Sequence, residues 1–196
     1  FHEWMHSWYQ GMLGTNESLY AWMDEGFAQW ATNKVQNYYR ETVIRKKFAD
    51  DPASLRKMDS MDNMLPKDQV SDYASYYYIA KSNIEEPLST HAYSAGAYSK
   101  GCVFLSQLGY IIGDSTLGVI MLEYYKQWRF KHPDVNDFIR IAENISSIKL
   151  DWYKEYWINT TKTIDYAIDS LWEDGGKTKI RLKNAGHLPM PIDVLI

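Results

Sequence analysis

The chain has 196 residues, a formal net charge of −4 and a single cysteine, Cys102. This length predicts one domain, or one domain with part of another, and the 45% hydrophobic content excludes a disordered chain. The acidic balance speaks against nucleic acid as a partner, and one cysteine excludes an internal disulfide framework. The sequence contains no apolar run of about 18 residues, so no transmembrane segment is predicted.

Most of the chain is predicted to be helical. Residues 1–13 are bulky and free of proline, and Gly11 and Gly14 mark the end of a first helix. A second helix is predicted over residues 19–48, because apolar residues recur at helical spacing after two candidate caps, Asn16 and Ser18. Further helices are predicted over residues 97–112, 116–129, 135–144 and 151–158, with one or two short helices within residues 49–70.

The pattern changes near residue 160. Residues 163–172 and 177–183 alternate apolar and polar side chains on either side of Gly175-Gly176, which predicts a β-hairpin. Residues 191–196 have the composition of the opening of a third strand. We therefore expect a mainly α fold, in which a helical domain of residues 1–160 precedes a β segment of residues 161–196.

Residues 2–6 read H-E-W-M-H, which is an H-E-x-x-H motif. Four residues make about one helical turn, so His2 and His6 would project from one face and could bind one Zn²⁺. Glu3 directly follows the first histidine, and from there its carboxylate can reach a metal-bound water. The motif fixes only three positions, so an ordinary helix with two histidines and one glutamate stays an alternative.

A zinc hydrolase also needs a third protein ligand. Glu25 follows His6 after 18 residues, and a neighbouring antiparallel helix could bring its carboxylate beside the histidine pair. The helix dipole also favours an acidic residue in a first turn, which explains the acid but not its spacing from the motif. Asp24 and Gln29 are candidates to orient the imidazole rings, although a capping or surface role is the more ordinary expectation for either.

Residues 22–28 read W-M-D-E-G-F-A, and at this point the chain resembles the gluzincin zinc aminopeptidases of the aminopeptidase N and leukotriene hydrolase type. That family carries H-E-x-x-H, 18 further residues and then glutamate within W-L-N-E-G-F-A, so Met23 and Asp24 depart from its pattern. The resemblance implies the helical C-terminal half of a thermolysin-like catalytic domain, followed by the start of a β-sandwich. It also implies one Zn²⁺ as cofactor, bound by the two histidines and Glu25.

A second match lies downstream. Residues 98–101 read Y-S-K-G and resemble the family's Y-x-K-G, whose tyrosine stabilises the oxyanion of the tetrahedral intermediate. The resemblance thereby implies a catalytic role for Tyr98, with Tyr93 as the alternative. The aromatic run Tyr73–Tyr78 is a further candidate for gripping substrate side chains. Looser matches to the family cover residues 131–138, 151–158 and 189–193.

These residues predict a zinc metallopeptidase that acts on peptides, and the resemblance implies the release of N-terminal residues. In the implied mechanism zinc lowers the pKa of bound water toward about 7, Glu3 takes the proton, and zinc and Tyr98 share the oxyanion. The family's G-x-M-E-N loop, which binds the substrate's amino group, lies upstream of the zinc helix and does not occur in this sequence. We therefore expect a fragment whose partner is a preceding domain of the same protein.

Four alternatives stay open at this point. The chain could be a non-catalytic zinc-binding scaffold, or an inert fragment of an enzyme of this kind. It could also belong to a gluzincin endopeptidase or to a glycyl aminopeptidase, since both share the zinc motif.

Overall fold

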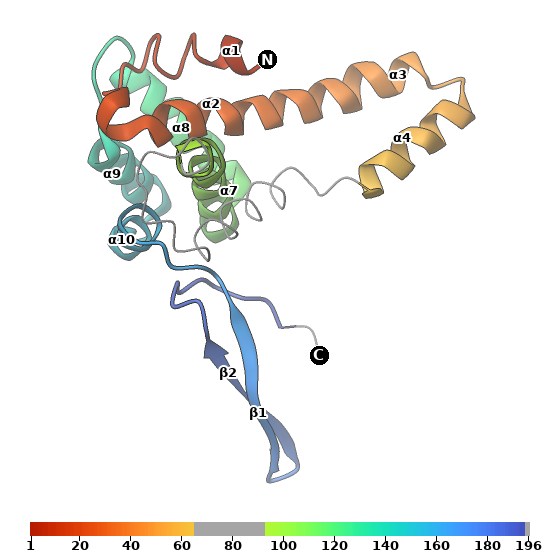
Figure 1. The fold of residues 1–196 in the computed structure, drawn as a ribbon, viewed down its shortest axis with the longest axis vertical. Coiled ribbons are helices and arrows are strands. Elements are labelled where there is room, and N and C mark those ends of the chain that lie inside the picture. The colour runs from red at the N-terminus through yellow and green to blue at the C-terminus, as the bar shows by residue number, and fades with distance from the viewer. Residues whose placement is uncertain (65–92, 195–196) are drawn as a thin grey trace. The chain divides into compact units, whose positions relative to one another are not determined.

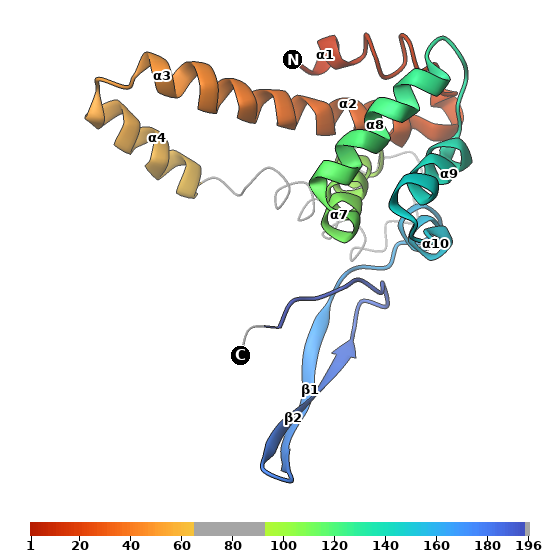
Figure 2. The same ribbon diagram turned by 180° about the vertical axis from the view of Figure 1, so that it is seen from behind.

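A computed structural model describes residues 1–64 and 93–194 of the chain, with side chains for residues 1–58 and 93–194. The chain divides into two compact units, Phe1–Ile148 and Lys149–Ile196. Helices make up the first unit, and the second contains one helix and a two-stranded sheet (Figures 1 and 2). The mainly α fold followed by a β segment is thus confirmed, while the domain boundary at residues 160–161 stays a prediction. Among the described residues, no helix combines the length and the apolar character needed to cross a membrane.

The first unit is built around one long helical run. It consists of α2 (Glu17–Tyr39), the π-helical segment η1 (Arg40–Ile44) and α3 (Arg45–Lys47), which follow one another without a break (Figure 1). This run confirms the helix predicted over residues 19–48, except for a kink at Tyr20, whose dihedral angles are not helical. It begins at Asn16, whose side chain accepts a hydrogen bond from the Ser18 backbone N–H at 3.1 Å. The unit's other elements are α1 (His2–Met5), α4 (Pro52–Met64), η2 (Ser94–Lys100), α7 (Gly101–Ile112), α8 (Asp114–Trp128) and α9 (Val135–Ser146).

The helix predicted over residues 1–13 is wrong beyond its first turn, because α1 ends at Met5. The chain then folds into tight turns, in which the Gly11 backbone N–H donates to the carbonyl of His6 at 2.8 Å. The Gly14 N–H donates instead to the carbonyl of Lys131, at 3.0 Å. Backbone N–H groups that a longer helix would have used are therefore bonded within turns and to a distant segment. These partners cannot be predicted from the local composition.

Aromatic side chains form the centre of the first unit. The ring of Phe138 on α9 lies 5.2 Å from the ring of Phe27 on α2 and 5.2 Å from that of Tyr124 on α8, both in edge-to-face arrangements. These three side chains are almost completely buried. Edge-to-face pairs at such distances stabilise a core beyond the area they bury. They fix α2 against α8 and α9, and so set the face of α2 that the candidate site uses.

A capping box begins α9 and allows a first test of the fold. The Asp134 carboxylate accepts hydrogen bonds from the N–H groups of Asn136 and Asp137, and the Asp137 side chain accepts one from the Asp134 N–H. Asp134→Ala should therefore lower the free energy of unfolding by about 1 kcal/mol, measured by thermal or chemical denaturation. Asp114→Ala is the control, because Asp114 lies in the first turn of α8 without capping it, and its loss should change stability by less than about 0.5 kcal/mol.

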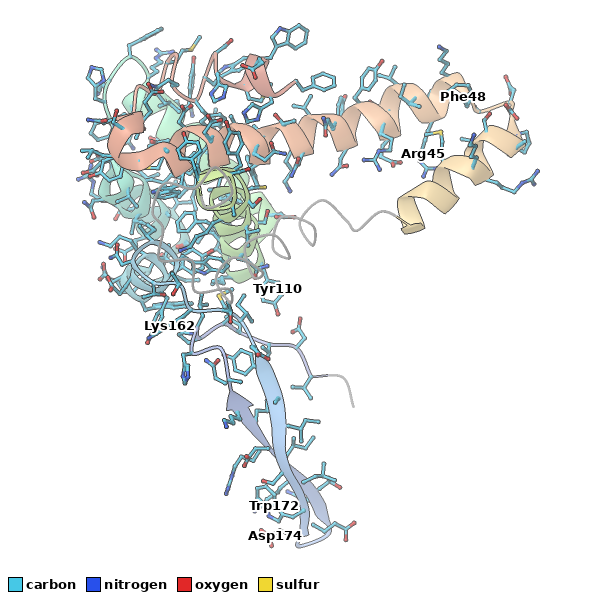
Figure 3. The ribbon with its side chains drawn as sticks, in the orientation of Figure 1. Arg45, Phe48, Tyr110, Lys162, Trp172 and Asp174 are labelled. Atoms are coloured by element: carbon cyan, nitrogen blue, oxygen red, sulfur yellow. The ribbon has the colours of Figure 1, made fainter. Side chains whose placement is uncertain are left out.

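The second unit contains α10 (Asp151–Asn159) and a hairpin of β1 (Tyr166–Asp174) and β2 (Lys177–Asn184). The strands are antiparallel and joined at Gly175-Gly176, where both residues have positive φ, as a two-residue hairpin turn requires. Trp172 and Asp174 lie near the turn (Figure 3), and the Arg181 guanidinium lies 5.5 Å from the Trp172 ring. The hairpin predicted from the sequence is confirmed.

The third strand predicted over residues 191–196 is wrong for the described part, residues 191–194, which form no strand. Pro189 and Pro191 have no backbone N–H to give to a ladder. The N–H between them, that of Met190, donates to the hydroxyl of Tyr166 at 3.0 Å. The backbone donors at the start of this segment are thus absent or already used.

Candidate metal centre

The two histidines of the motif lie on the same side of one helical turn, although α1 is short. His6 lies just beyond α1, but its backbone keeps helical dihedral angles and its N–H donates to the His2 carbonyl at 3.4 Å. One turn of helix therefore separates the two rings, whose centroids are 4.8 Å apart. The spacing of the motif thus has the predicted effect without the predicted longer helix.

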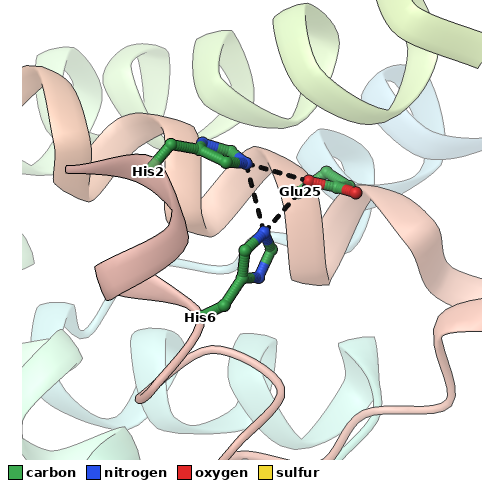
Figure 4. Close-up of side chains that lie close together, drawn as sticks. All are labelled: His2, His6 and Glu25. Carbon is green, nitrogen blue, oxygen red and sulfur yellow. Dashed lines mark hydrogen bonds and ion pairs between the residues drawn. The ribbon is translucent and has the colours of Figure 1, made fainter.

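Glu25 reaches the histidine pair from α2, which packs against α1. Its Oε2 lies 3.0 Å from Nε2 of His2 and 3.3 Å from Nε2 of His6, and the two Nε2 atoms are 3.1 Å apart (Figure 4). Ligand atoms bound tetrahedrally at about 2.0–2.1 Å from zinc would lie about 3.3 Å from one another. The three predicted ligands thus fit one metal ion, and among the described residues they are the one group of histidine and acidic side chains gathered in this way.

The other nitrogen of His6 is held from the opposite side of the ring. Its Nδ1 lies 3.2 Å from the carbonyl oxygen of Tyr9 and 2.8 Å from Oδ1 of Asp24. A carbonyl oxygen only accepts hydrogen bonds, so Nδ1 carries the proton and a neutral ring offers Nε2 as its lone-pair atom. Burial lowers the pKa of His6, but Asp24, the Tyr9 carbonyl and Glu25 outweigh it, and the pKa lies above its ordinary value.

The structure distinguishes between Asp24 and Gln29, the two residues that the sequence suggested as partners of the imidazole rings. Asp24 is buried inside α2 and contacts His6, whereas the Gln29 side chain donates to the Oδ1 of Asn33 at 2.9 Å. Burial raises the pKa of Asp24, and the facing His6 opposes that shift. The capping or surface role expected for Asp24 is wrong, because α2 begins eight residues earlier at Asn16.

Tyr98 lies on η2 beside the first histidine. Its ring stacks on that of His2, with centroids 5.5 Å apart and planes inclined by 25°. Burial and the neighbouring Glu25 carboxylate raise the pKa of Tyr98 far above its usual range. Tyr93 is half exposed, and its ring lies 6.3 Å from that of Tyr98. The geometry favours Tyr98 over Tyr93, and Tyr73–Tyr78 lie outside the described residues.

Two glycines bring the helix of Glu25 and the helix of Tyr98 together. A Cβ atom added to Gly26 would lie 2.4 Å from the Cα of Gly101, and one added to Gly101 would lie 2.6 Å from the carbonyl oxygen of Trp22. The backbones of α2 and of the η2–α7 junction therefore touch, with no room for a side chain between them. Both glycines stand in the motifs that the sequence singled out, E-G-F-A and Y-S-K-G, but their mutual contact was not predicted.

Glu3 has a different environment from the ligand cluster. Its side chain is exposed and lines a surface hollow of about 330 Å³ together with Phe1 and Trp4. It belongs to the same helical turn as His2, as the motif requires. The carboxylate is therefore accessible to solvent, and the hollow that it lines includes none of the three ligand residues.

The sequence of the chain is similar to that of known proteins. The sequence profile described as the peptidase family M1 domain matches residues 1–157. Aminopeptidase M1-C of Oryza sativa subsp. japonica is 22% identical over 171 residues, which are 87% of this chain and 18% of that enzyme. Aminopeptidase M1-D of the same plant is 23% identical over 146 residues, which are 74% of this chain and 15% of that enzyme. The chain thus spans less than a fifth of the length of these curated relatives.

The fold has a counterpart among solved structures. The crystal structure of a mutant M1 zinc metallopeptidase from Deinococcus radiodurans superposes with a TM-score of 0.54 at 17% identity, over 80% of this chain and 32% of that one. Fold and relatives place the chain among the metallopeptidases. The chain belongs to peptidase family M1. This confirms the resemblance to gluzincin zinc aminopeptidases drawn from the sequence motifs.

Proposed function

We propose that the chain is the zinc-binding part of a metallopeptidase that releases N-terminal residues from peptides. The observation that carries this proposal is the convergence of His2 and His6 with Glu25 at separations of 3.0 to 3.3 Å. Two imidazole nitrogens and one carboxylate oxygen are a donor set found in catalytic zinc sites, which keep a fourth position open.

In this proposal His2, His6 and Glu25 hold one zinc ion. A bound zinc ion would act as a Lewis acid and lower the pKa of a coordinated water toward about 7. The Nδ1–H of His6, fixed by the Tyr9 carbonyl, keeps Nε2 available for the metal. Because Glu25 lies on α2 and the histidines on or just after α1, the packing of these two segments sets the donor geometry.

Glu3 and Tyr98 are proposed to carry the proton transfers and the charge stabilisation. Glu3 is exposed on the same helical turn as His2, and from this position it is proposed to accept the proton of the attacking water and pass it to the leaving amine. Tyr98, like an ordinary tyrosine, is a phenol at neutral pH, so its hydroxyl can donate to the oxyanion that forms at the scissile carbonyl. The release of N-terminal residues is supported by the two plant relatives, which are named aminopeptidases.

Zinc binding tests the site directly. The chain, stripped of metal with a chelator, should take up one equivalent of Zn²⁺ in a calorimetric titration. His6→Ala and Glu25→Gln should each abolish tight binding, because two donors remain from three. His187→Ala is the matched control, since His187 is exposed in the second unit, and it should bind zinc like the unchanged chain. Equal binding by all variants would contradict the proposed ligands.

Substrate choice tests the reaction. The zinc-loaded chain should hydrolyse aminoacyl anilides and leave N-blocked peptides intact. Cleavage of N-blocked peptides alone would contradict the aminopeptidase proposal and favour an endopeptidase. Zinc binding without hydrolysis of either substrate would favour the scaffold or inert-fragment alternative for this chain.

A further inference from the structure

We propose that Asp24 is a positioning residue for His6, and that its negative charge strengthens zinc binding at this ligand. This inference rests on the zinc site proposed above. Asp24 comes directly before Glu25 on α2, so two consecutive carboxylates face one imidazole from two sides. Glu25 Oε2 lies 3.3 Å from Nε2 of His6, and Asp24 Oδ1 lies 2.8 Å from its Nδ1.

The burial of Asp24 requires a partner for its carboxylate. The side chain is only 8% exposed, and Asp24 lies four residues beyond the kink of α2 at Tyr20, while the side-chain cap of α2 is supplied by Asn16. A buried carboxylate costs stability unless a positive or donating group faces it. His6 is the basic group that the structure places beside it. The carboxylate is therefore oriented toward the ligand ring.

The arrangement is asymmetric between the two histidines. Within the described part of the chain, Nδ1 of His2 is buried and has no hydrogen-bond partner, while Nδ1 of His6 hydrogen-bonds to the Tyr9 carbonyl and makes an ion-pair contact with the Asp24 carboxylate. The carbonyl alone fixes the tautomer of His6. What Asp24 adds is a negative charge, which makes the imidazole a stronger donor to a metal and restricts the rotation of the ring.

This inference predicts a specific loss of zinc affinity. Asp24→Asn keeps the size of the side chain and removes the charge, so the zinc affinity of the chain, measured by competition with a chelator, should fall about tenfold or more. Asp24→Ala should weaken binding at least as much. Asp114→Asn is the control, because it makes the same chemical change at an exposed position on α8 and should leave the affinity unchanged.

A spectroscopic measurement distinguishes positioning from a general loss of stability. In the zinc-loaded chain, ¹⁵N NMR of the imidazole rings should show the Nδ1 resonance of His6 displaced in Asp24→Asn, with the resonances of His2 unchanged. Equal displacement of both histidines would overturn the proposal, because it would indicate a general rearrangement of α1. Far-ultraviolet circular dichroism of each variant confirms that the helices are retained.

The inference and the proposed function fail in different ways. If the unchanged chain binds zinc and Asp24→Asn binds it within about twofold of the same affinity, the role of Asp24 is overturned while the zinc site stands. If the unchanged chain binds no zinc, both are overturned.

Discussion

Glu3→Gln is expected to lower the hydrolysis of aminoacyl anilides by the zinc-loaded chain by about 10²- to 10⁴-fold. The amide keeps the size of the side chain but cannot accept a proton from the attacking water. Zinc stoichiometry should remain one per chain, because the three proposed ligands are untouched. The measurement is kcat together with the zinc content of the same sample, so that a loss of metal is not taken for a loss of the base.

Glu17→Gln is the matched control for this prediction. Glu17 is also an exposed glutamate near the start of a helix, and it accepts a hydrogen bond from Gln10 at 2.9 Å. Its replacement changes the net charge by the same amount and should leave kcat unchanged. If Glu3→Gln lowered the zinc affinity together with kcat, the assignment of Glu3 as the base would be contradicted.

Gly26→Ala should have the largest effect on stability, with a loss of about 3 kcal/mol in the free energy of unfolding. The added methyl group would lie 2.4 Å from the Cα of Gly101 and 2.9 Å from the Ala97 carbonyl oxygen, which are backbone atoms that cannot rotate away. For a chain of this length the unfolding midpoint should fall by roughly 6–12 °C. Because Glu25 precedes Gly26, zinc affinity should fall as well.

Gly118→Ala gives a control with the opposite sign. Gly118 is exposed within α8, and an added Cβ would meet no atom within 4 Å. Alanine is favoured over glycine in a helix by about 0.5–1 kcal/mol, so this variant should be slightly more stable than the unchanged chain. If Gly26→Ala were also stabilising, the close contact of the two backbones would be refuted. The double variant with Gly101→Ala should lose less than the sum of the two single losses, since both remove one contact.

The metal ligands could be predicted because their arrangement is local. The i, i+4 spacing of His2 and His6 follows from one turn of helix, and the distance to Glu25 follows from a second helix that returns antiparallel. Helices α8, α9 and α10 and the hairpin were also predicted close to their observed bounds, because glycine, proline and polar residues mark the breaks between them, and the Asp134 capping box begins α9. Tyr98 was predicted only because residues 98–101 match the family's Y-x-K-G motif. Without that resemblance, helical spacing and composition would not have selected it among 16 tyrosines.

Other features depend on contacts that the sequence does not display. The first helix stops at Met5, and the residues that follow bond in tight turns and, at Gly14, to the distant Lys131. The role of Asp24 could not be decided from the sequence, because an acidic residue near the start of a helix is ordinarily exposed. Its burial results from the packing of α1 on α2. The backbone contact between Gly26 and Gly101 joins two motifs that the sequence presents as separate.

The proposed ligands lie close to one another in the sequence, whereas Tyr98 lies far from all of them. His2, His6 and Glu25 all come from the first 25 residues, so the entropy of closing the loop that joins them is small. If these residues bind zinc as proposed, an incompletely folded chain would already capture it, and metal bound to that state would offset part of the stabilisation that zinc gives to the native state. Tyr98 joins the ligands only when η2 packs against α2 at the Gly101 contact. This contact joins distant parts of the sequence and is therefore expected to form more slowly. Metal capture and catalytic competence would then be separate events in the folding of this chain, and zinc content alone does not report the second.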